Sequence, residues 1–137
     1  MFCKSILVPV DLAHPEAAGV MFDRARALLR PGGRLTVLHA VPDLAPHVTM
    51  EMPDDFLPEA LRKADDTLRA LVADAGLDAD IRILSGQAPR AILDTTDQVR
   101  ADLIMIASHR PGLSDYLLGS TAARVVRHAT CSVLVIR

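Results

Sequence analysis

The chain has 137 residues, a formal net charge of −2, an apolar fraction of 50% and an aromatic fraction of only 3%. This length fits one domain with a sizeable core, and the balanced charge, without a long run of either sign, excludes a broad nucleic-acid surface. The N-terminus lacks the basic-then-apolar pattern of a signal peptide, and no apolar stretch approaches the roughly 18 residues of a membrane helix. We therefore expect a cytoplasmic protein that binds neither nucleic acid nor a membrane.

The first quarter of the chain predicts a strand, a helix and a second strand. Residues 5–10 form a short apolar run that reads as a buried strand, with Pro9 near its end. Pro15 suits the first residue of a helix, and apolar residues then recur at helical spacing. We expect residues 31–33, Pro-Gly-Gly, to stop this helix and residues 34–41 to form the second strand.

Residues 41–58 are the one long stretch in which we expect no regular element. Pro42, Pro46, Pro53 and Pro58 interrupt it, and loops of this length in a compact domain are usually functional or mobile. From Glu59 onward, apolar residues at helical spacing predict an amphipathic helix that stops at Gly76. Residues 81–84 then predict a short strand.

The remaining residues continue the alternation of helix and strand. The pattern predicts a helix over Ala88–Val99, a strand over residues 103–106, a helix over Ser120–His128 and a last strand over Ser132–Ile136. Such alternation favours a parallel sheet with right-handed crossovers. We therefore expect a single α/β domain, residues 1–137, in which a five-stranded, mainly parallel sheet is flanked by four helices.

Several kinds of site are excluded by missing residues. A Walker A loop needs a lysine after its glycines, yet the chain has only Lys4 and Lys63, and no Gly-x-Gly-x-x-Gly follows the first strand. The five histidines have no zinc-ligand spacing. Cys3 and Cys131 are far apart and form no Cys-x-x-Cys unit, so we expect reduced thiols rather than a disulfide or a metal site.

The ends of the first two strands carry candidate groups for a nucleoside. Pro9, Val10 and Asp11 end the first strand, and the Asp11 carboxylate either accepts hydrogen bonds from ribose hydroxyls or serves as an N-cap or turn acceptor for the first helix. At the end of the second strand, the backbone and small apolar surface around Ala40 could meet an adenine edge. We expect His39 itself to be a buried, hydrogen-bonded histidine.

The last third of the chain has the parts of a phosphate site. An apolar strand leads into a polar loop with Ser108, His109 and Arg110, and Gly119-Ser120 follows at the start of a helix. Free amides at a helix start, a glycine that lets an anion approach, and cationic side chains all suit phosphate. The alternative is that Ser120 is an ordinary N-cap.

Catalysis has little support in the sequence. Ser108 and His109 are adjacent, but neighbours on an extended chain point in opposite directions, so adjacency does not make a nucleophile–base pair. No general base or water-positioning residue is evident, so we expect at most slow hydrolysis of a bound ligand.

The chain resembles the universal stress protein family, F- and G-type branch, over nearly its whole length. The resemblance rests on residues 6–11 (Ile-Leu-Val-Pro-Val-Asp), 37–40 (Val-Leu-His-Ala), 102–107 (Asp-Leu-Ile-Met-Ile-Ala) and the ending from Leu117. Nucleotide-binding members carry Gly-x-x-Gly, nine residues, then Gly-Ser/Thr. Here Ala107 replaces the first glycine and the loop is one residue shorter, while Gly119-Ser120 matches.

The resemblance implies a Rossmann-like fold of the adenine nucleotide alpha hydrolase type that binds ATP, with or without Mg²⁺. It also implies a homodimer joined through the last strand, Ser132–Ile136, and a role in the response to stress. Its implied nucleotide-binding residues are Pro9, Val10, Asp11, Ala40, Ile106, Ala107, Ser108, His109, Arg110, Gly119, Ser120 and Thr121.

Two other functions stay open. In the first, the shorter loop that begins at Ala107 has closed the phosphate site, and the protein is a nucleotide-free dimeric interaction module. In the second, it is a slow ATPase or an autophosphorylating protein with Ser108 or Ser120 as the acceptor.

Overall fold

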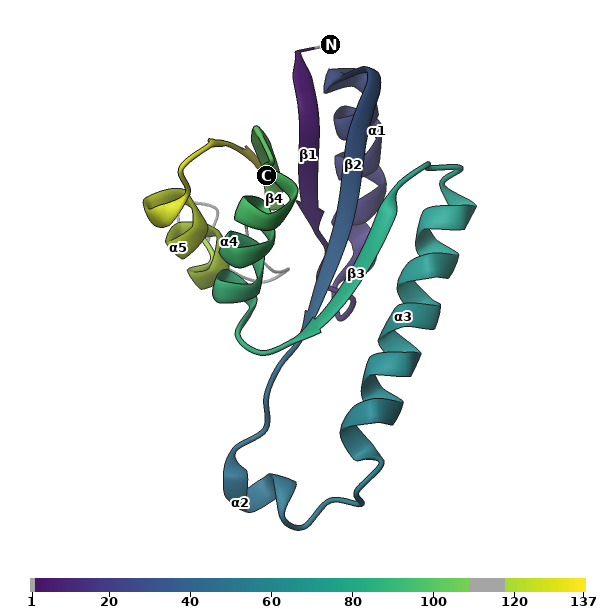
Figure 1. The fold of residues 1–137 in the computed structure, drawn as a ribbon, viewed down its shortest axis with the longest axis vertical. Coiled ribbons are helices and arrows are strands. Elements are labelled where there is room, and N and C mark those ends of the chain that lie inside the picture. The colour runs from purple at the N-terminus through teal and green to yellow at the C-terminus, as the bar shows by residue number, and fades with distance from the viewer. Residues whose placement is uncertain (1, 109–117) are drawn as a thin grey trace.

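The computed structural model describes residues 2–108 and 118–137, in which the chain forms one five-stranded sheet with every strand parallel to its neighbours (Figure 1). The strands are β1 (Cys3–Pro9), β2 (Leu29–Val41), β3 (Asp80–Ser85), β4 (Leu103–Ala107) and β5 (Ser132–Ile136). The helices are α1 (Ala18–Leu28), α2 (Pro46–Thr49), α3 (Phe56–Asp74), α4 (Ala88–Val99) and α5 (Ser120–His128), with a 3-10 turn, η1 (Pro15–Ala17), before α1. The expected α/β class is confirmed, and α2 is a short addition to the four expected helices.

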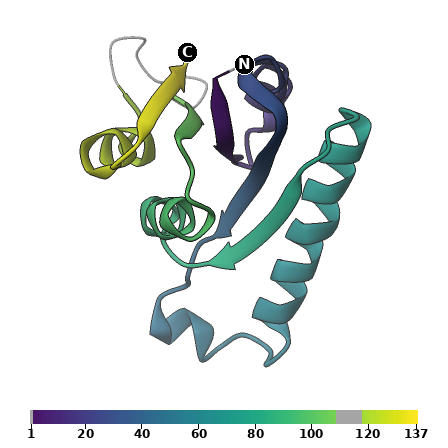
Figure 2. The same ribbon diagram turned by 45° about the horizontal axis from the view of Figure 1, so that its top comes forward.

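The helices cover both faces of the sheet. Figure 2 shows α1 and α3 on one side and α4 and α5 on the other. Successive side chains of a strand point to opposite faces, so Ile6 and Val8 of β1 pack with Phe22 of α1, whereas Leu7 packs with Ile92 of α4. This burial on both faces explains why β1 is a continuous apolar run rather than an alternating one.

The strand order β3-β2-β1-β4-β5 places the reversal of the winding between β1 and β4. The pairing of β1 with β2 continues to Pro9↔Leu38, but its pairing with β4 stops earlier, at Leu7↔Ile104. The carboxyl ends of β1 and β4 are therefore not joined by ladder hydrogen bonds. Ligands of open α/β sheets bind at such a switch point.

The start of β2 differs from the expectation that residues 31–33 stop the first helix and the strand follows them. β2 already begins at Leu29, directly after α1. Leu29 pairs with Cys3 and Arg34 pairs with Ser5, so β2 advances further than β1 between these pairs and bulges. Gly32, at φ +77°, adopts the left-handed conformation that this bulge contains.

Residues 41–58 contain more regular structure than their prolines predict. Pro46 is the first residue of α2, and α3 begins at Phe56, ahead of the expected Glu59. Pro58 thus lies in the first turn of α3, where a missing N–H costs no intrahelical hydrogen bond. The expectation that the prolines break every regular element was wrong for Pro46 and Pro58.

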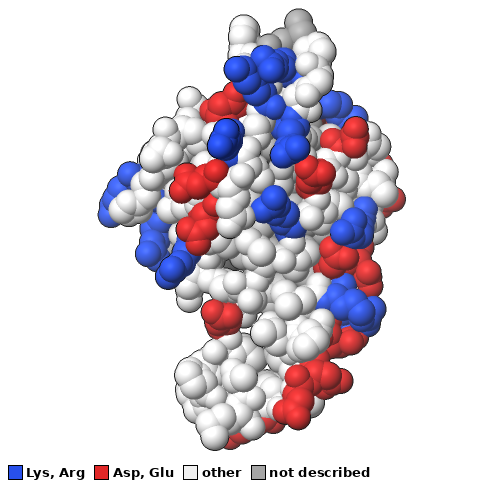
Figure 3. Space-filling model, viewed as in Figure 1, with Lys and Arg blue, Asp and Glu red and all other residues white. Residues whose placement is uncertain are grey.

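The segment formed by α2 and the first half of α3 projects beyond the sheet (Figure 1). α2 has no buried residue, and the buried residues of α3, Leu68 and Val72, belong to its second half. Figure 3 shows this projection as mainly uncharged, with acidic side chains along one margin, while charges of both signs are interspersed over the rest of that face. The projection therefore has little contact with the core.

The two cysteines are free, as expected. Cys3 packs against the cluster covered by α1 and α3, and Cys131 packs against the one covered by α4 and α5. Burial and the nearby Asp102 carboxylate raise the pKa of both thiols, which favours the unreactive protonated form. Among the helices that the structure describes, none is both long and apolar enough to cross a membrane.

The Asp102 carboxylate ties the start of β4 to the start of β1. It accepts the N–H of Lys4 at 2.8 Å and that of Ser5 at 3.1 Å, and the Asp102 N–H donates to the Ser5 carbonyl at 2.9 Å. The Ser5 hydroxyl donates in turn to the carbonyl of Val99, the last residue of α4, at 3.2 Å. Burial acts to raise the pKa of Asp102, but the backbone N–H groups and the Lys4 charge outweigh it and lower the pKa below its ordinary value.

We expect Asp102→Asn to destabilise the fold by about 1 kcal/mol at neutral pH, because an amide offers one oxygen to two N–H donors. A lowered folded-state pKa contributes stability above the unfolded-state value of about 3.9 and loses it as the pH falls through the folded-state value. The stability difference between wild type and variant should therefore shrink below about pH 4. Urea denaturation across this pH range measures it, with Asp78→Asn as the matched surface control. A constant difference down to acid pH would contradict the assignment.

Candidate functional site

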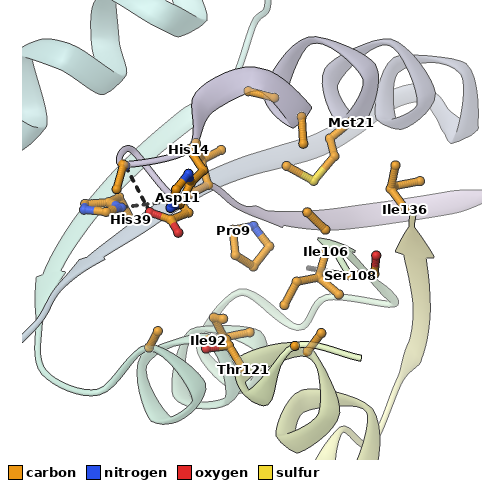
Figure 4. A pocket seen from close by; sticks show the side chains of 18 of the residues that line it. Pro9, Asp11, His14, Met21, His39, Ile92, Ile106, Ser108, Thr121 and Ile136 are labelled. Carbon is orange, nitrogen blue, oxygen red and sulfur yellow. Dashed lines mark hydrogen bonds between the residues drawn. The ribbon is translucent and has the colours of Figure 1, made fainter. Parts of the chain in front are cut away.

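A cleft of about 830 Å³ opens at the carboxyl ends of β1, β2 and β4 (Figure 4). The residues after β1, the start of α1, and parts of α4 and α5 form its walls. Met21, Ile92 and Ile106 supply apolar surface, and Asp11 and Ser108 supply polar groups. A mostly apolar cleft of this size, with a few convergent polar groups, is typical of a small-molecule site.

Every sequence-predicted binding residue within the described part of the chain lines this one cleft. These residues are Pro9, Val10, Asp11, Ala40, Ile106, Ala107, Ser108, Gly119, Ser120 and Thr121. The other two, His109 and Arg110, lie outside the described residues. Distant parts of the sequence meet here because parallel strands bring their carboxyl ends to the same edge of the sheet.

Asp11 begins the turn that carries the chain from β1 to η1. Its Oδ1 accepts the N–H of Ala13 at 3.0 Å, and its carbonyl accepts the N–H of His14 at 3.0 Å. The structure thus shows the turn-acceptor role that was one of the two alternatives for this carboxylate. Because Asp11 also lines the cleft, and a carboxylate accepts several hydrogen bonds at once, this role leaves room for contact with a ligand.

His39 and Ala40 lie where β2 runs on past the end of β1. His39 is half-buried, and its Nδ1 is 2.8 Å from the Val10 carbonyl oxygen. Since a carbonyl only accepts, this ring nitrogen carries the hydrogen and donates it. The expectation of a hydrogen-bonded histidine is confirmed, although the ring is less buried than expected.

The backbone of Ala40 faces the end of β1. The Leu38 carbonyl accepts the N–H of Val10 at 2.8 Å, and groups two residues apart on a strand point the same way. The N–H and carbonyl of Ala40 therefore point toward the space that β1 leaves as it turns away after Val10. A donor and an acceptor side by side can pair with the edge of a planar heterocycle.

The N-terminus of α5 lies beside the end of β4. The N-cap is Gly119, and no described side chain caps the helix, so the alternative of Ser120 as N-cap was wrong. The Gly119 N–H donates to the Ser108 carbonyl, and the Ser108 N–H donates to the Ile136 carbonyl, which fixes the helix start against β4 and β5. The first amides of α5 need acceptors, and an anion in the cleft can supply them.

Sequence reasoning missed several residues of the cleft. Met21 and Ile92 belong to helix faces that the apolar pattern marked only as core, and their position in the wall depends on the fold. Arg137 follows the last strand, and it is the one Lys or Arg among the described residues that line the cleft, whose lining also contains the acidic Asp11 and Glu16. Its place directly after a strand's carboxyl end was the available signal.

Metal ligands are sparse around the cleft. Among the described residues, no group of three or more His, Cys, Asp or Glu side chains could hold a metal ion. A Mg²⁺ ion here would be coordinated mainly by oxygens of a bound small molecule and by water. Asp11 and Glu16 are the carboxylates that line the cleft. Such sparse protein ligation is usual for Mg²⁺ that accompanies phosphates.

A parallel sheet with a ligand-sized cleft at its switch point defines a Rossmann-like α/β protein. The chain belongs to the universal stress protein family, whose family model matches residues 3–137. Universal stress protein G of Salmonella typhimurium is 29% identical over 140 residues, which cover 98% of this chain and 99% of that protein. This likeness agrees with the branch that the sequence resembles.

Solved structures support the same fold. The universal stress protein UspA from Lactobacillus plantarum superimposes with a TM-score of 0.79 at 27% identity, over 100% of this chain and 99% of that one. A universal stress protein in complex with cAMP has a TM-score of 0.62 at 25% identity, over 100% of this chain and 98% of that one. The family thus contains a structure with a bound adenine nucleotide.

Proposed function

We propose that this chain is a homodimeric universal stress protein that binds ATP in the cleft and responds to stress or metabolic state through that binding. The observation that carries the proposal is the N-terminus of α5, which no described side chain caps, in the wall of a cleft that Ala40 also lines. The relative with bound cAMP supports an adenine nucleotide as the ligand class.

The base would lie at the end of β2. Adenine presents an acceptor, N1, beside a donor, the N6 amino group, and the N–H and carbonyl of Ala40 form the complementary pair. Guanine presents a donor at N1 and an acceptor at O6, so the same edge would meet like groups. This pairing favours adenine over guanine without any base-specific side chain.

The sugar would lie between the base and the helix start. Asp11 would accept hydrogen bonds from ribose hydroxyls, while Pro9 and Ile106 would cover its apolar surface. The Asp11 carboxylate is already held by the Ala13 N–H, so it would enter the complex with its position set. A group held in place before binding loses less conformational entropy when the ligand arrives.

The phosphates would lie against the start of α5. The amides of Ser120 and Thr121 and their hydroxyls would donate to phosphate oxygens, and Gly119 would let the phosphate approach the backbone. Ala107 and Ser108, at the end of β4, would border them. Arg137 would supply positive charge, since a guanidinium suits phosphate oxygens. Mg²⁺, where present, would neutralise part of the phosphate charge.

Calorimetric titration of nucleotide-free protein with ATP, adenosine and GTP tests the function. We expect micromolar binding of ATP, weaker binding of adenosine and no measurable binding of GTP. Gly119→Val should weaken ATP binding at least tenfold, about 1.4 kcal/mol, because the branched side chain obstructs the phosphate. Gly19→Val is the matched control, since a Cβ at Gly19 meets nothing within 4 Å.

No binding of ATP by folded wild-type protein would overturn the proposal and favour the nucleotide-free interaction module. Phosphoserine at Ser108 or Ser120 after incubation with ATP, detected by mass spectrometry, would instead favour the autophosphorylating alternative.

Arg137→Gln separates the phosphate subsite from the nucleoside subsite. We expect the affinity for ATP to fall about tenfold, because a charge-assisted hydrogen bond is lost, while the affinity for adenosine stays within about twofold. Arg127→Gln, an exposed arginine in the last turn of α5, is the matched control. Equal losses for ATP and adenosine would show that Arg137 supports the fold of the cleft rather than the phosphates.

The homodimer would form along β5, an edge of the sheet. Val133, Leu134 and Val135 are only partly buried in one chain. The Ile136 carbonyl accepts from Ser108 on the β4 side, so the backbone groups of Val135, one residue earlier, point to the open edge. An apolar strand with free backbone groups favours pairing with another strand.

Val135→Asp should convert the dimer to monomer, because the charge would enter a buried strand pairing; we expect the dimer dissociation constant to rise more than about 100-fold. Analytical ultracentrifugation measures it, with circular dichroism to check the fold. Val20→Asp, which alters a valine that is 46% exposed on α1, should leave the dimer intact. A stable Val135→Asp dimer would contradict pairing through β5.

A further inference from the structure

The end of the β1–β2 ladder departs from regular parallel pairing. In a parallel ladder, a residue that donates its N–H to one carbonyl of the neighbouring strand accepts with its own carbonyl from the N–H two residues further on. Val10 donates to the Leu38 carbonyl at 2.8 Å. The regular continuation would be donation from the Ala40 N–H to the Val10 carbonyl.

That bond is replaced by a side chain. The Val10 carbonyl accepts from His39 Nδ1 at 2.8 Å, and no backbone hydrogen bond joins it to Ala40 among the described residues. Val10 is buried, with 4% of its surface exposed, so its carbonyl needs a partner. The imidazole supplies that partner from the residue just before Ala40.

We propose that His39 is a positioning residue. Its imidazole donates to the Val10 carbonyl instead of the Ala40 N–H, and this keeps the Ala40 N–H available to the ligand. The inference rests on the proposed adenine site, in which that N–H donates to N1 of the base. Without the imidazole, the Val10 carbonyl would accept the Ala40 N–H, and the ladder would close over the donor that the base requires.

The same arrangement fixes the shape of the site. After Val10 the chain enters the turn in which Asp11 Oδ1 accepts the Ala13 N–H at 3.0 Å. The imidazole bridges Val10 and β2 at the point where this turn leaves the sheet (Figure 4). Closing the ladder would draw Val10 toward Ala40 and shift the start of the Asp11 turn with it.

Three substitutions of His39 separate positioning from direct contact with the ligand. His39→Asn retains a donor near the position of Nδ1, His39→Gln places its amide near the position of Nε2, and His39→Leu retains neither. If His39 acts by donating to the Val10 carbonyl, only His39→Asn among these three variants should keep the wild-type exchange rate of the Ala40 amide and the wild-type preference for a base with N1. His47→Leu, a substitution of an exposed histidine in α2 outside the cleft lining, is the matched control.

The first measurement is hydrogen exchange of the Ala40 amide in the ligand-free protein by NMR. We expect this amide to exchange at least about tenfold more slowly in His39→Leu than in wild type, since it gains a hydrogen bond. A scalar coupling across the hydrogen bond to the Val10 carbonyl should appear in the same variant. Wild type, His39→Asn and His47→Leu should show neither. Unchanged exchange in His39→Leu would overturn the proposal.

The second measurement compares ATP with its 1-deaza analogue, which replaces N1 by a C–H group. Wild type, His39→Asn and His47→Leu should bind ATP about tenfold more tightly than the analogue. His39→Leu and His39→Gln should bind both ligands alike, at the weaker level. Because each comparison is made within one variant, a general loss of stability does not imitate the result.

Two outcomes would overturn the positioning role. In the first, His39→Leu still binds ATP more tightly than the 1-deaza analogue. In the second, His39→Gln keeps this preference and His39→Asn loses it. The latter would assign His39 a direct contact through Nε2. Failure of wild type to bind ATP would refute the proposed function alone, because Ala40 exchange in the free protein would still decide what His39 does.

Discussion

The central strand β1 is the constraint on which the rest of the structure depends. It is buried on both faces and paired on both edges, and its start is fixed by the Asp102 carboxylate through the N–H groups of Lys4 and Ser5. The candidate site exists because this pairing stops at different places on the two edges. β2 pairs with β1 as far as Pro9, whereas β4 pairs with it only as far as Leu7, so the end of β1 at Pro9 is left to line the cleft.

The parts of the fold that follow from local pattern were predictable. The helices Ala88–Val99 and Ser120–His128 and the strand Ser132–Ile136 have the expected bounds, because their apolar spacing and their flanking residues agree. Most candidate site residues were predicted in the same way, since strand ends followed by polar groups must meet at one edge of a parallel sheet, whereas Ile106 and Ala107 were predicted only from the family resemblance. The sequence alone therefore placed Asp11, Ala40 and Gly119 close together.

What the sequence could not predict depends on contacts between elements. The early start of β2 at Leu29 follows from its pairing with Cys3, which overrides the helix-stopping and turn-forming character of residues 31–33. The early start of α3 reflects the tolerance of a first helical turn for Pro58. The bond from His39 to Val10 joins two strands, and no spacing rule within one segment reveals it. The place of Arg137 in the wall of the cleft likewise depends on the position of β5 beside β4.

The projection made of α2 and the first half of α3 has a consequence for how the molecule opens. It contains no buried side chain before Leu68 in α3, and Met50 within it is 87% exposed. A segment with so few core contacts can unfold by itself at a free energy well below that of the whole domain. We therefore expect two cooperative units: a sheet that opens only with global unfolding, and a peripheral unit that samples open states while the cleft stays formed.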